Sequence, residues 1–253
     1  MADPVVQHNI DDRGVATITL DSPHNRNALS RALLEGFHEA LDAVEAADAR
    51  VIVVDHTGPA FCAGADLKER SSGPPDSGPM VEALRRLMDT PRPTIAAVHG
   101  AVRAGGIGLM ASCDLVVMDQ TVDIALTEVR IGVAAAIISV PILTRVNPGQ
   151  IAAAMLTGES FSAEEARRIG LITHVSNDVV ATVDALCEGV LAGAPGAVAA
   201  TKAMLARVPQ LDRDTAFDEM RSLSERMFSG DDAQEGMASF LERRRPTWDT
   251  RRH

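Results

Sequence analysis

Short apolar runs alternate with amphipathic stretches through the first half of the chain. Two β-rich runs, residues 5–10 and 15–20, flank the polar residues 11–14 and predict a β-hairpin. Continuous apolar runs of the buried-strand type follow at residues 51–54, 94–98, 115–118 and 124–126. Helices are predicted between these runs, at residues 30–45 and 80–88 and in a stretch that ends near residue 113. Strands that alternate with helices in this order predict an α/β domain with a largely parallel sheet.

The pattern becomes mainly helical after residue 147. Ser162 and Glu165 form a capping box that predicts a helix ending at Gly170, and a short β-rich run follows at 172–175. Two alanine-rich helices come next, and the last two helices are predicted at about 214–228 and 232–245. Residues 71–79, rich in proline and glycine, predict a mobile loop.

Composition and charge narrow the class of protein. The chain is 46% hydrophobic, yet no run approaches the roughly 18 uncharged residues of a membrane helix. The N-terminus has neither the basic region nor the apolar region of a signal peptide, so we expect a cytoplasmic protein. Its net charge of −11, from 24 basic and 35 acidic residues, disfavours binding to nucleic acid or to an anionic membrane. The three cysteines include no C-x-x-C pair and no metal-ligand spacing occurs, so no metal is expected.

Two glycine-rich segments carry the candidate chemistry: FCAGADLK at residues 61–68 and GAVRAGGIG at 100–108, here called the first and second glycine segments. Each leaves a predicted strand and enters a predicted helix. Glycine lets the backbone turn tightly and expose its N–H groups to an anionic oxygen. Neither segment matches a nucleotide-binding glycine pattern. The pair therefore predicts an oxyanion hole, with a lone acid, Glu128, twenty residues beyond Gly108.

Five motifs in one order resemble the enoyl-CoA hydratase/isomerase (crotonase) superfamily: NAL at 27–29, AGADL at 63–67, GG at 105–106, Glu128 ahead of RIG at 130–132, and EGMASF at 235–240. The resemblance runs from about residue 15 to 246. It implies an α/β fold, the ClpP-like spiral of β-β-α turns, with residues 1–195 forming the core that carries the acyl-CoA site. Residues 196–253 would form a helical region that covers the site and mediates oligomerisation, as a homotrimer or hexamer.

The resemblance also implies roles for individual residues. The backbone N–H groups of Ala65 and Gly105 would bind the thioester oxygen, and Glu128 would be the general acid and base. An acyl-CoA thioester would be the substrate, with no cofactor beyond the CoA that it carries. Contacts to CoA are implied for Arg26, Ala28, Ala63, Asp66, Leu67 and Lys68, and a contact near the pantetheine for Phe240. Our hypothesis for Arg103 is that it approaches a CoA phosphate or a distal carboxylate of the substrate.

The chain departs from the family pattern at Gly108. Hydratases of the family typically carry a first catalytic glutamate there, and a proline with several glycines where this chain has AAAIIS at 134–139. The motifs GGIGL at 105–109 and TEVRIG at 127–132 are similar to a bacterial subgroup that includes 3-methylglutaconyl-CoA hydratases. We therefore predict an enoyl-CoA hydratase. A Δ3-Δ2-enoyl-CoA isomerase that uses one glutamate, and a non-catalytic acyl-CoA binding protein, are the alternatives.

Overall fold

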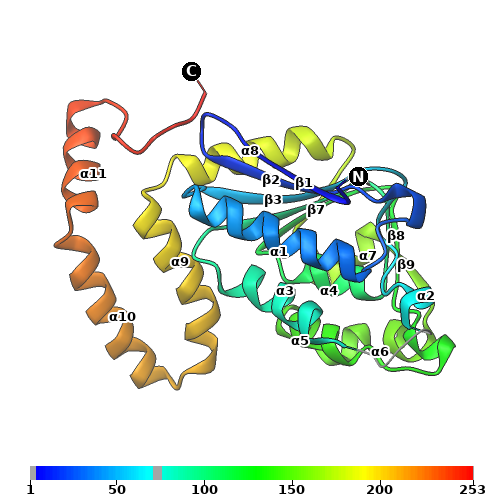
Figure 1. Cartoon of the computed structure of the whole chain (residues 1–253). Coiled ribbons are helices and arrows are strands. Elements are labelled where there is room, and N and C mark those ends of the chain that lie inside the picture. The colour runs from blue at the N-terminus through cyan, green and yellow to red at the C-terminus, as the bar shows by residue number, and fades with distance from the viewer. Residues whose placement is uncertain (1–3, 71–75, 253) are drawn as a thin grey trace.

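Two β-sheets form the frame of the fold (Figure 1). The computed structural model describes residues 4–70 and 76–252. The large sheet has the strand order β1 (Val6–Ile10), β2 (Val15–Leu20), β3 (Val51–His56), β5 (Thr94–Val98), β7 (Leu115–Asp119) and β10 (His174–Ser176). The small sheet has the order β4 (Ala60–Cys62), β6 (Ala101–Arg103), β8 (Asp123–Ala125) and β9 (Ser160–Ser162).

The pairing of the strands confirms the predicted hairpin and the largely parallel sheet. β1 and β2 are antiparallel, and the remaining strands of the large sheet pair in parallel. In the small sheet only β9 runs antiparallel to its neighbour. The run predicted at residues 172–175 forms a strand only from His174. Part of the loop predicted at 71–79 lies outside the described residues, and Gly78 already begins a helix.

Helices pack on both faces of the large sheet, and further helices follow at the C-terminal end. The helices of the described residues are α1 (Arg31–Ala46), α2 (Leu67–Arg70), α3 (Gly78–Asp89), α4 (Gly105–Ala111), α5 (Ala136–Arg145), α6 (Pro148–Thr157), α7 (Ala163–Arg168), α8 (Val179–Leu191), α9 (Pro195–Arg207), α10 (Arg213–Phe228) and α11 (Asp231–Glu242), with a 3-10 turn, η2, at Glu128–Ile131. The N-cap half of the predicted capping box is confirmed, because the Ser162 hydroxyl accepts a hydrogen bond from the Glu165 N–H at 3.2 Å. The Glu165 carboxylate accepts from Arg168 instead of returning to the Ser162 N–H.

The hydrophobic core has two parts, one on each face of the large sheet. Side chains of α1, α3 and α4 pack against one face, while α8 packs against the other through Val183, Cys187 and Leu191 (Figure 1). All three cysteines are buried, and burial raises the pKa of each thiol to about 12. A thiol in such an environment stays protonated and is a poor nucleophile.

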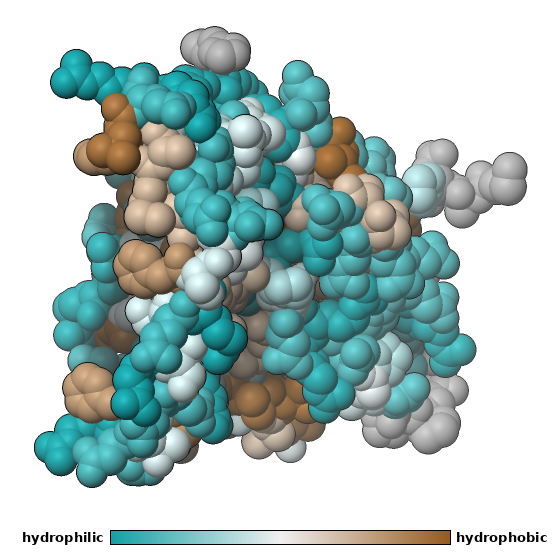
Figure 2. Space-filling view, turned by 90° about the vertical axis from the view of Figure 1, so that its left-hand side faces the viewer, coloured by the Kyte–Doolittle hydropathy of each residue, from teal (hydrophilic) through white to brown (hydrophobic). Residues whose placement is uncertain are grey.

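The helices α9 to α11 extend away from the sheets (Figure 1). Figure 2 faces this side and shows hydrophobic side chains on its surface among polar ones. α11 ends at Glu242, three residues earlier than predicted, where Arg243 adopts a left-handed conformation. The chain then returns to the core, and the Trp248 indole donates to the Ala192 carbonyl at 3.1 Å.

In the described part of the chain, no single helix is long and apolar enough to cross a membrane. One bent pair, Val179–Leu191 with Pro195–Gln210, meets the criteria of length and composition together, with a bend of 110°.

Candidate active site

Three strands of the small sheet bring the predicted site residues to one edge. β4, β6 and β8 pair in parallel, with Ala60 beside Ala101 and Val102 beside Ile124. Residues 63–66 of the first glycine segment follow β4, residues 104–106 of the second follow β6, and residues 126–128 follow β8. The carboxyl ends of parallel strands lie at the same edge of a sheet. The two glycine segments and Glu128 are therefore neighbours, as the sequence predicts.

The two glycine segments interlock through backbone that few residues can adopt. Gly64 has φ +91°, and Ala104 has φ +47°, which is rare for a residue with a side chain. A Cβ on Gly64 would lie 2.8 Å from the Ala104 Cβ and 3.4 Å from the Gly105 nitrogen. A Cβ on Gly105 would lie 3.8 Å from the Ala65 nitrogen. The two amides that the sequence predicts to share one ligand oxygen thus lie on touching turns.

The N–H groups of Ala65 and Gly105 are available to a ligand. Neither donates a hydrogen bond to any residue that the structure describes. Gly105 is the first residue of α4, where the N–H groups have no partner within the helix. The bridge between Leu29 and the first glycine segment uses the Gly64 carbonyl, which accepts from the Leu29 N–H at 2.8 Å. Ala65 and Gly105 are both half-buried, so a ligand can reach their amides while the surrounding protein limits access of water.

Glu128 begins η2 directly after the β8 edge. Its Oε2 atom is buried and is the one such side-chain nitrogen or oxygen in the described residues without a hydrogen-bond partner. Burial raises the pKa of this carboxyl. A hydrogen bond of 3.2 Å from the Ala104 N–H to the Ala125 carbonyl ties its strand to the second glycine segment. A carboxyl with raised proton affinity and a free oxygen, at the sheet edge that also carries two unpaired amides, is suited to proton transfer.

Gly108 provides no functional group and has no space for one. A Cβ at this position would lie 2.3 Å from Cγ2 of Ile138 and 2.7 Å from its Cβ. Ile138 is in α5, within the AAAIIS segment that departs from the family pattern, and is 5% exposed. The isoleucine therefore occupies the space beside α4 that a side chain at position 108 would need.

The residues with an implied role in CoA binding lie on two adjacent segments. The Ala63 N–H donates to the Arg26 carbonyl at 3.0 Å, which joins residues 26–28 to the first glycine segment. The Asp66 carboxylate accepts from the Lys68 N–H at 3.0 Å at the start of α2. Leu67 is 59% exposed, as expected of a side chain that a ligand could cover. The structure thus brings together the set Arg26, Ala28, Ala63, Asp66, Leu67 and Lys68.

Arg103 and Phe240 occupy different surroundings. Nη1 of Arg103 donates to the Val102 carbonyl at 2.9 Å and to the Asp123 carbonyl, so this arginine links β6 to β8. Its contact with the substrate stays a prediction. Phe240 is 81% exposed on α11, which lies at the opposite side of Figure 1 from α2 and α5. Within one chain it does not lie beside the other site residues.

Asn27 holds the site together in a way that the sequence did not reveal. It is fully buried, and its Oδ1 accepts from the Ser22 N–H at 2.7 Å. Its Nδ2 donates to the carbonyls of Thr57 at 3.0 Å and Ala60 at 2.8 Å. It thereby fixes residues 26–28 against the turn that enters β4. The two carbonyls that accept from Asn27 lie 30 and 33 residues further along the chain, so no local pattern could indicate them. Only the position of Asn27 in the NAL motif indicated that the residue matters.

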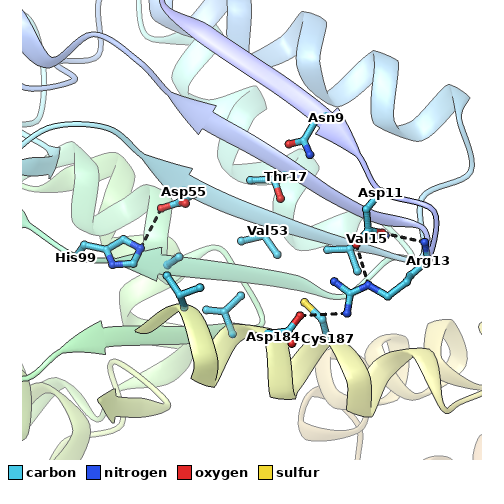
Figure 3. A pocket seen from close by; sticks show the side chains of 13 residues that line it. Asn9, Asp11, Arg13, Val15, Thr17, Val53, Asp55, His99, Asp184 and Cys187 are labelled. Atoms are coloured by element: carbon cyan, nitrogen blue, oxygen red, sulfur yellow. Dashed lines mark hydrogen bonds and ion pairs between the residues drawn. The ribbon is translucent and has the colours of Figure 1, made fainter. Parts of the chain in front are cut away.

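A separate cavity of about 190 Å³ lies between α8 and the face of the large sheet that α8 covers (Figure 3). At one end Arg13 pairs with Asp11 at 2.8 Å and with Asp184 at 3.1 Å. At the other end His99 lies 3.2 Å from Asp55. None of the predicted site residues lines this cavity, so it is distinct from the site described above.

Comparisons with known proteins agree with the sequence motifs. The profile of the Enoyl-CoA hydratase/isomerase family matches residues 11–251. Enoyl-CoA hydratase EchA19 of Mycobacterium tuberculosis is 32% identical, over 92% of this chain and 91% of that protein. A solved enoyl-CoA hydratase of Mycobacterium smegmatis is 31% identical with a TM-score of 0.91, over 97% of this chain and 99% of that chain. One from Mycobacterium avium is 41% identical with a TM-score of 0.74, over 98% and 100%. These superpositions confirm the predicted fold class.

Proposed function

Because the chain belongs to the enoyl-CoA hydratase/isomerase family, we propose that it is an enoyl-CoA hydratase that adds water across the 2,3-double bond of an enoyl-CoA thioester. The observation that carries the proposal is that two segments with unpaired amides, on Ala65 and Gly105, and the residue with a buried, unpartnered oxygen, Glu128, all follow the same edge of the small sheet. Relatives that are named enoyl-CoA hydratases along almost the whole chain support it.

The two amides act where negative charge develops. When a nucleophile adds to Cβ of an enoyl thioester, electrons move onto the thioester oxygen and give an enolate. The N–H groups of Ala65 and Gly105 donate to that oxygen and stabilise the charged state more than the neutral substrate. Loss of one such donor typically costs about 3–4 kcal/mol of transition-state stabilisation.

Glu128 supplies both proton transfers. As a carboxylate it accepts a proton from water while the water oxygen bonds to Cβ. It then returns a proton to Cα as the enolate collapses, which leaves the enzyme unchanged. A raised pKa, caused here by burial, suits a group that must both accept and release a proton. General acid-base catalysis of this kind typically contributes about 10²–10⁴-fold.

The CoA part of the substrate would lie along residues 26–28 and 63–68. Their mutual backbone bonds hold these segments at a fixed separation before the ligand binds, which lowers the cost of ordering them. We propose that the reaction needs no cofactor beyond the CoA of the substrate and that it takes place in the cytoplasm.

One specific observation favours a second candidate, a Δ3-Δ2-enoyl-CoA isomerase. Ile138 fills the space at Gly108, so Glu128 is the only acid that these two positions supply. Isomerisation needs one base that removes a proton from C2 and returns it to C4, with no water to hold. The paired amides would stabilise the dienolate in the same way as the enolate of hydration.

The decisive experiment compares three reactions in the wild type and in Glu128→Gln. Hydration of crotonyl-CoA and of methylglutaconyl-CoA is measured beside isomerisation of a 3-enoyl-CoA. We expect hydration in the wild type and a fall in kcat of at least about 10²-fold in the variant. Isomerisation alone, lost in Glu128→Gln, would establish the second candidate. Saturable binding of CoA thioesters without turnover in either protein would identify a binding protein instead.

A further inference from the structure

Each glycine segment is reached by a short connection that leads from a strand of the large sheet to a strand of the small sheet, here called a crossing. β3 and β5 pair in parallel from Ile52 beside Thr94 to Val54 beside Ala96. β3 ends at His56 and β5 at Val98, and the chain then passes to the small sheet through residues 57–59 into β4 and through residues 99–100 into β6. These crossings lead directly to the first and second glycine segments. Their relative position therefore sets the separation of the Ala65 and Gly105 amides.

The side chain of His56 joins the two crossings. Its Nε2 accepts a hydrogen bond of 3.1 Å from the backbone N–H of His99, and its Nδ1 lies 3.4 Å from the Thr57 carbonyl. Its ring stands edge-on to Phe61 in β4, with centroids 5.6 Å apart and an angle of 83° between the planes. The side chain thus continues the ladder of β3 and β5 at the point where their backbones separate.

Both ring nitrogens of His56 are committed in one protonation state. Because Nε2 accepts an N–H, it carries no proton, and Nδ1 bears the single proton that points to the Thr57 carbonyl. A second proton on Nε2 would place two donors against each other and break the link to His99. His56 is 8% exposed, so water cannot readily replace the lost bond.

We propose that His56 is a positioning residue, whose neutral imidazole holds the crossing into β6 against the crossing into β4 and so keeps the Ala65 and Gly105 amides at the spacing that one thioester oxygen requires. The inference rests on the proposed function of these amides. A second contact between the crossings, from the Ala101 N–H to the Pro59 carbonyl at 3.2 Å, lies on the β6 side of the same junction.

The charged groups around His56 favour its neutral form. Burial lowers its pKa, and the neighbouring His99 ring, 5.5 Å away, lowers it further when charged. His99 itself pairs with Asp55 (Figure 3), and this hydrogen bond, with a smaller contribution from Asp119, raises its pKa. Asp55 also favours the proton on His56, but less than burial opposes it. When this pair of histidines binds one further proton, the proton therefore binds to His99, which borders the cavity under α8. His56 stays neutral, and its Nε2 stays a hydrogen-bond acceptor.

The test compares His56→Leu, which removes the acceptor, with His56→Gln, whose amide oxygen can accept the His99 N–H at any pH. Val44→Ala is the control for lost stability, because it truncates a fully buried side chain of α1 away from both crossings. We expect His56→Leu to lower kcat about tenfold or more, with KM changed less than about threefold, because misplaced donors affect the transition state most. His56→Gln should retain most of kcat, and Val44→Ala should leave it unchanged.

Hydrogen exchange measured by mass spectrometry gives a readout that does not depend on turnover. In His56→Leu, peptides covering residues 57–66 and 99–106 should exchange faster than in the wild type, in His56→Gln and in Val44→Ala. Unchanged exchange in His56→Leu, or an equal loss of kcat in His56→Gln and His56→Leu, would overturn the proposal. A wild type without turnover would refute the proposed function, while the exchange data would still decide whether His56 holds the crossings.

Discussion

A Cβ atom on Gly108 would lie 2.3 Å from Cγ2 of Ile138, so α4 and α5 approach too closely for any side chain at position 108. Glycine at 108 and a branched residue at 138 are therefore one feature of the packing and not two independent departures from the family pattern. In the proposed site, Glu128 is therefore the one acid that positions 108 and 128 supply, because Ile138 fills the space beside Gly108.

This packing predicts a strong coupling between the two positions. Gly108→Ala should destabilise the fold by about 1–3 kcal/mol through overpacking. Ile138→Ala should cost about 2–5 kcal/mol through the cavity that it leaves. In the double variant the new methyl group enters that cavity, so the cost should be smaller than the sum by about 0.5–3 kcal/mol. Urea unfolding of the four proteins measures all three quantities.

Gly189 in α8 offers a matched control, because a Cβ there would meet no atom within 4 Å. Gly189→Ala should stabilise the protein by about 0.5–1 kcal/mol through the helix propensity of alanine. If Gly108→Ala changed the free energy of unfolding no more unfavourably than Gly189→Ala does, the close packing of α4 on α5 would be contradicted.

Glu128 should lower stability at neutral pH. Burial raises its pKa, so the folded state favours the protonated form. Its stabilising effect is full below the ordinary pKa of a glutamate, about 4.3, and is lost as pH rises through the raised value. The free energy of unfolding of Glu128→Gln relative to the wild type should therefore be higher at pH 7 than at pH 4. Chemical denaturation at the two pH values measures the difference.

Glu165 is the matched control for this pH dependence. Its hydrogen bonds from Arg168, at 2.6 and 2.7 Å, lower its pKa, so the fold favours its charged form. Glu165→Gln should accordingly change relative stability with the opposite sign between pH 4 and pH 7, and only slightly, because the pair is exposed. Equal pH dependence in the two variants would contradict the assignment of Glu128 as a carboxyl opposed by burial.

The placement of the candidate site residues was predictable from the sequence because they follow strands in a fixed order. Ala65, Gly105 and Glu128 each lie within a few residues of a turn that glycine or a change of pattern marks. The sheet that aligns them was harder to predict. β4, β6 and β9 have three residues each, which is too few for a period of two to be recognised.

The residues that hold the site in place were not predictable from local pattern. Asn27 and His56 act through partners that lie 30 to 43 residues further along the chain, which only the folded topology brings near. The role of Ile138 was hidden for the same reason. The sequence predicted that residues 134–139 would reshape the wall of the pocket, but the contact with Gly108 depends on how α5 packs on α4.

Asn27 predicts a defect that separates hydrogen bonding from backbone strain. Asn27→Ala removes the acceptor of the buried Ser22 N–H and one donor each from the carbonyls of Thr57 and Ala60, which should cost about 1–3 kcal/mol. The residue also has φ +53°, which costs alanine about 1–2 kcal/mol more. Asn27→Gly loses the same bonds without that strain and should be more stable than Asn27→Ala by a similar amount. Thermal unfolding tests this order, and a wild-type value for Asn27→Ala would refute it.

The C-terminal helices predict self-association. Large apolar side chains on α9 to α11 are mostly exposed in one chain: Leu205, Phe217, Phe228, Met237, Phe240 and Leu241. Burying a side chain of this size stabilises a contact by about 1.5–3 kcal/mol. We expect the wild type to sediment at about three or six times 26.8 kDa. The variant with Phe228, Phe240 and Leu241 replaced by serine should sediment as a monomer.

Val180→Ser is the control for this prediction, because Val180 is 68% exposed on α8, away from these helices. It should assemble like the wild type. If Phe240 reaches the site of a neighbouring copy, the triple variant should also show a raised KM for the CoA thioester, because one chain alone does not place Phe240 beside its own site. A monomeric wild type at micromolar concentration, or a triple variant that assembles normally, would contradict a role for α10 and α11 in association.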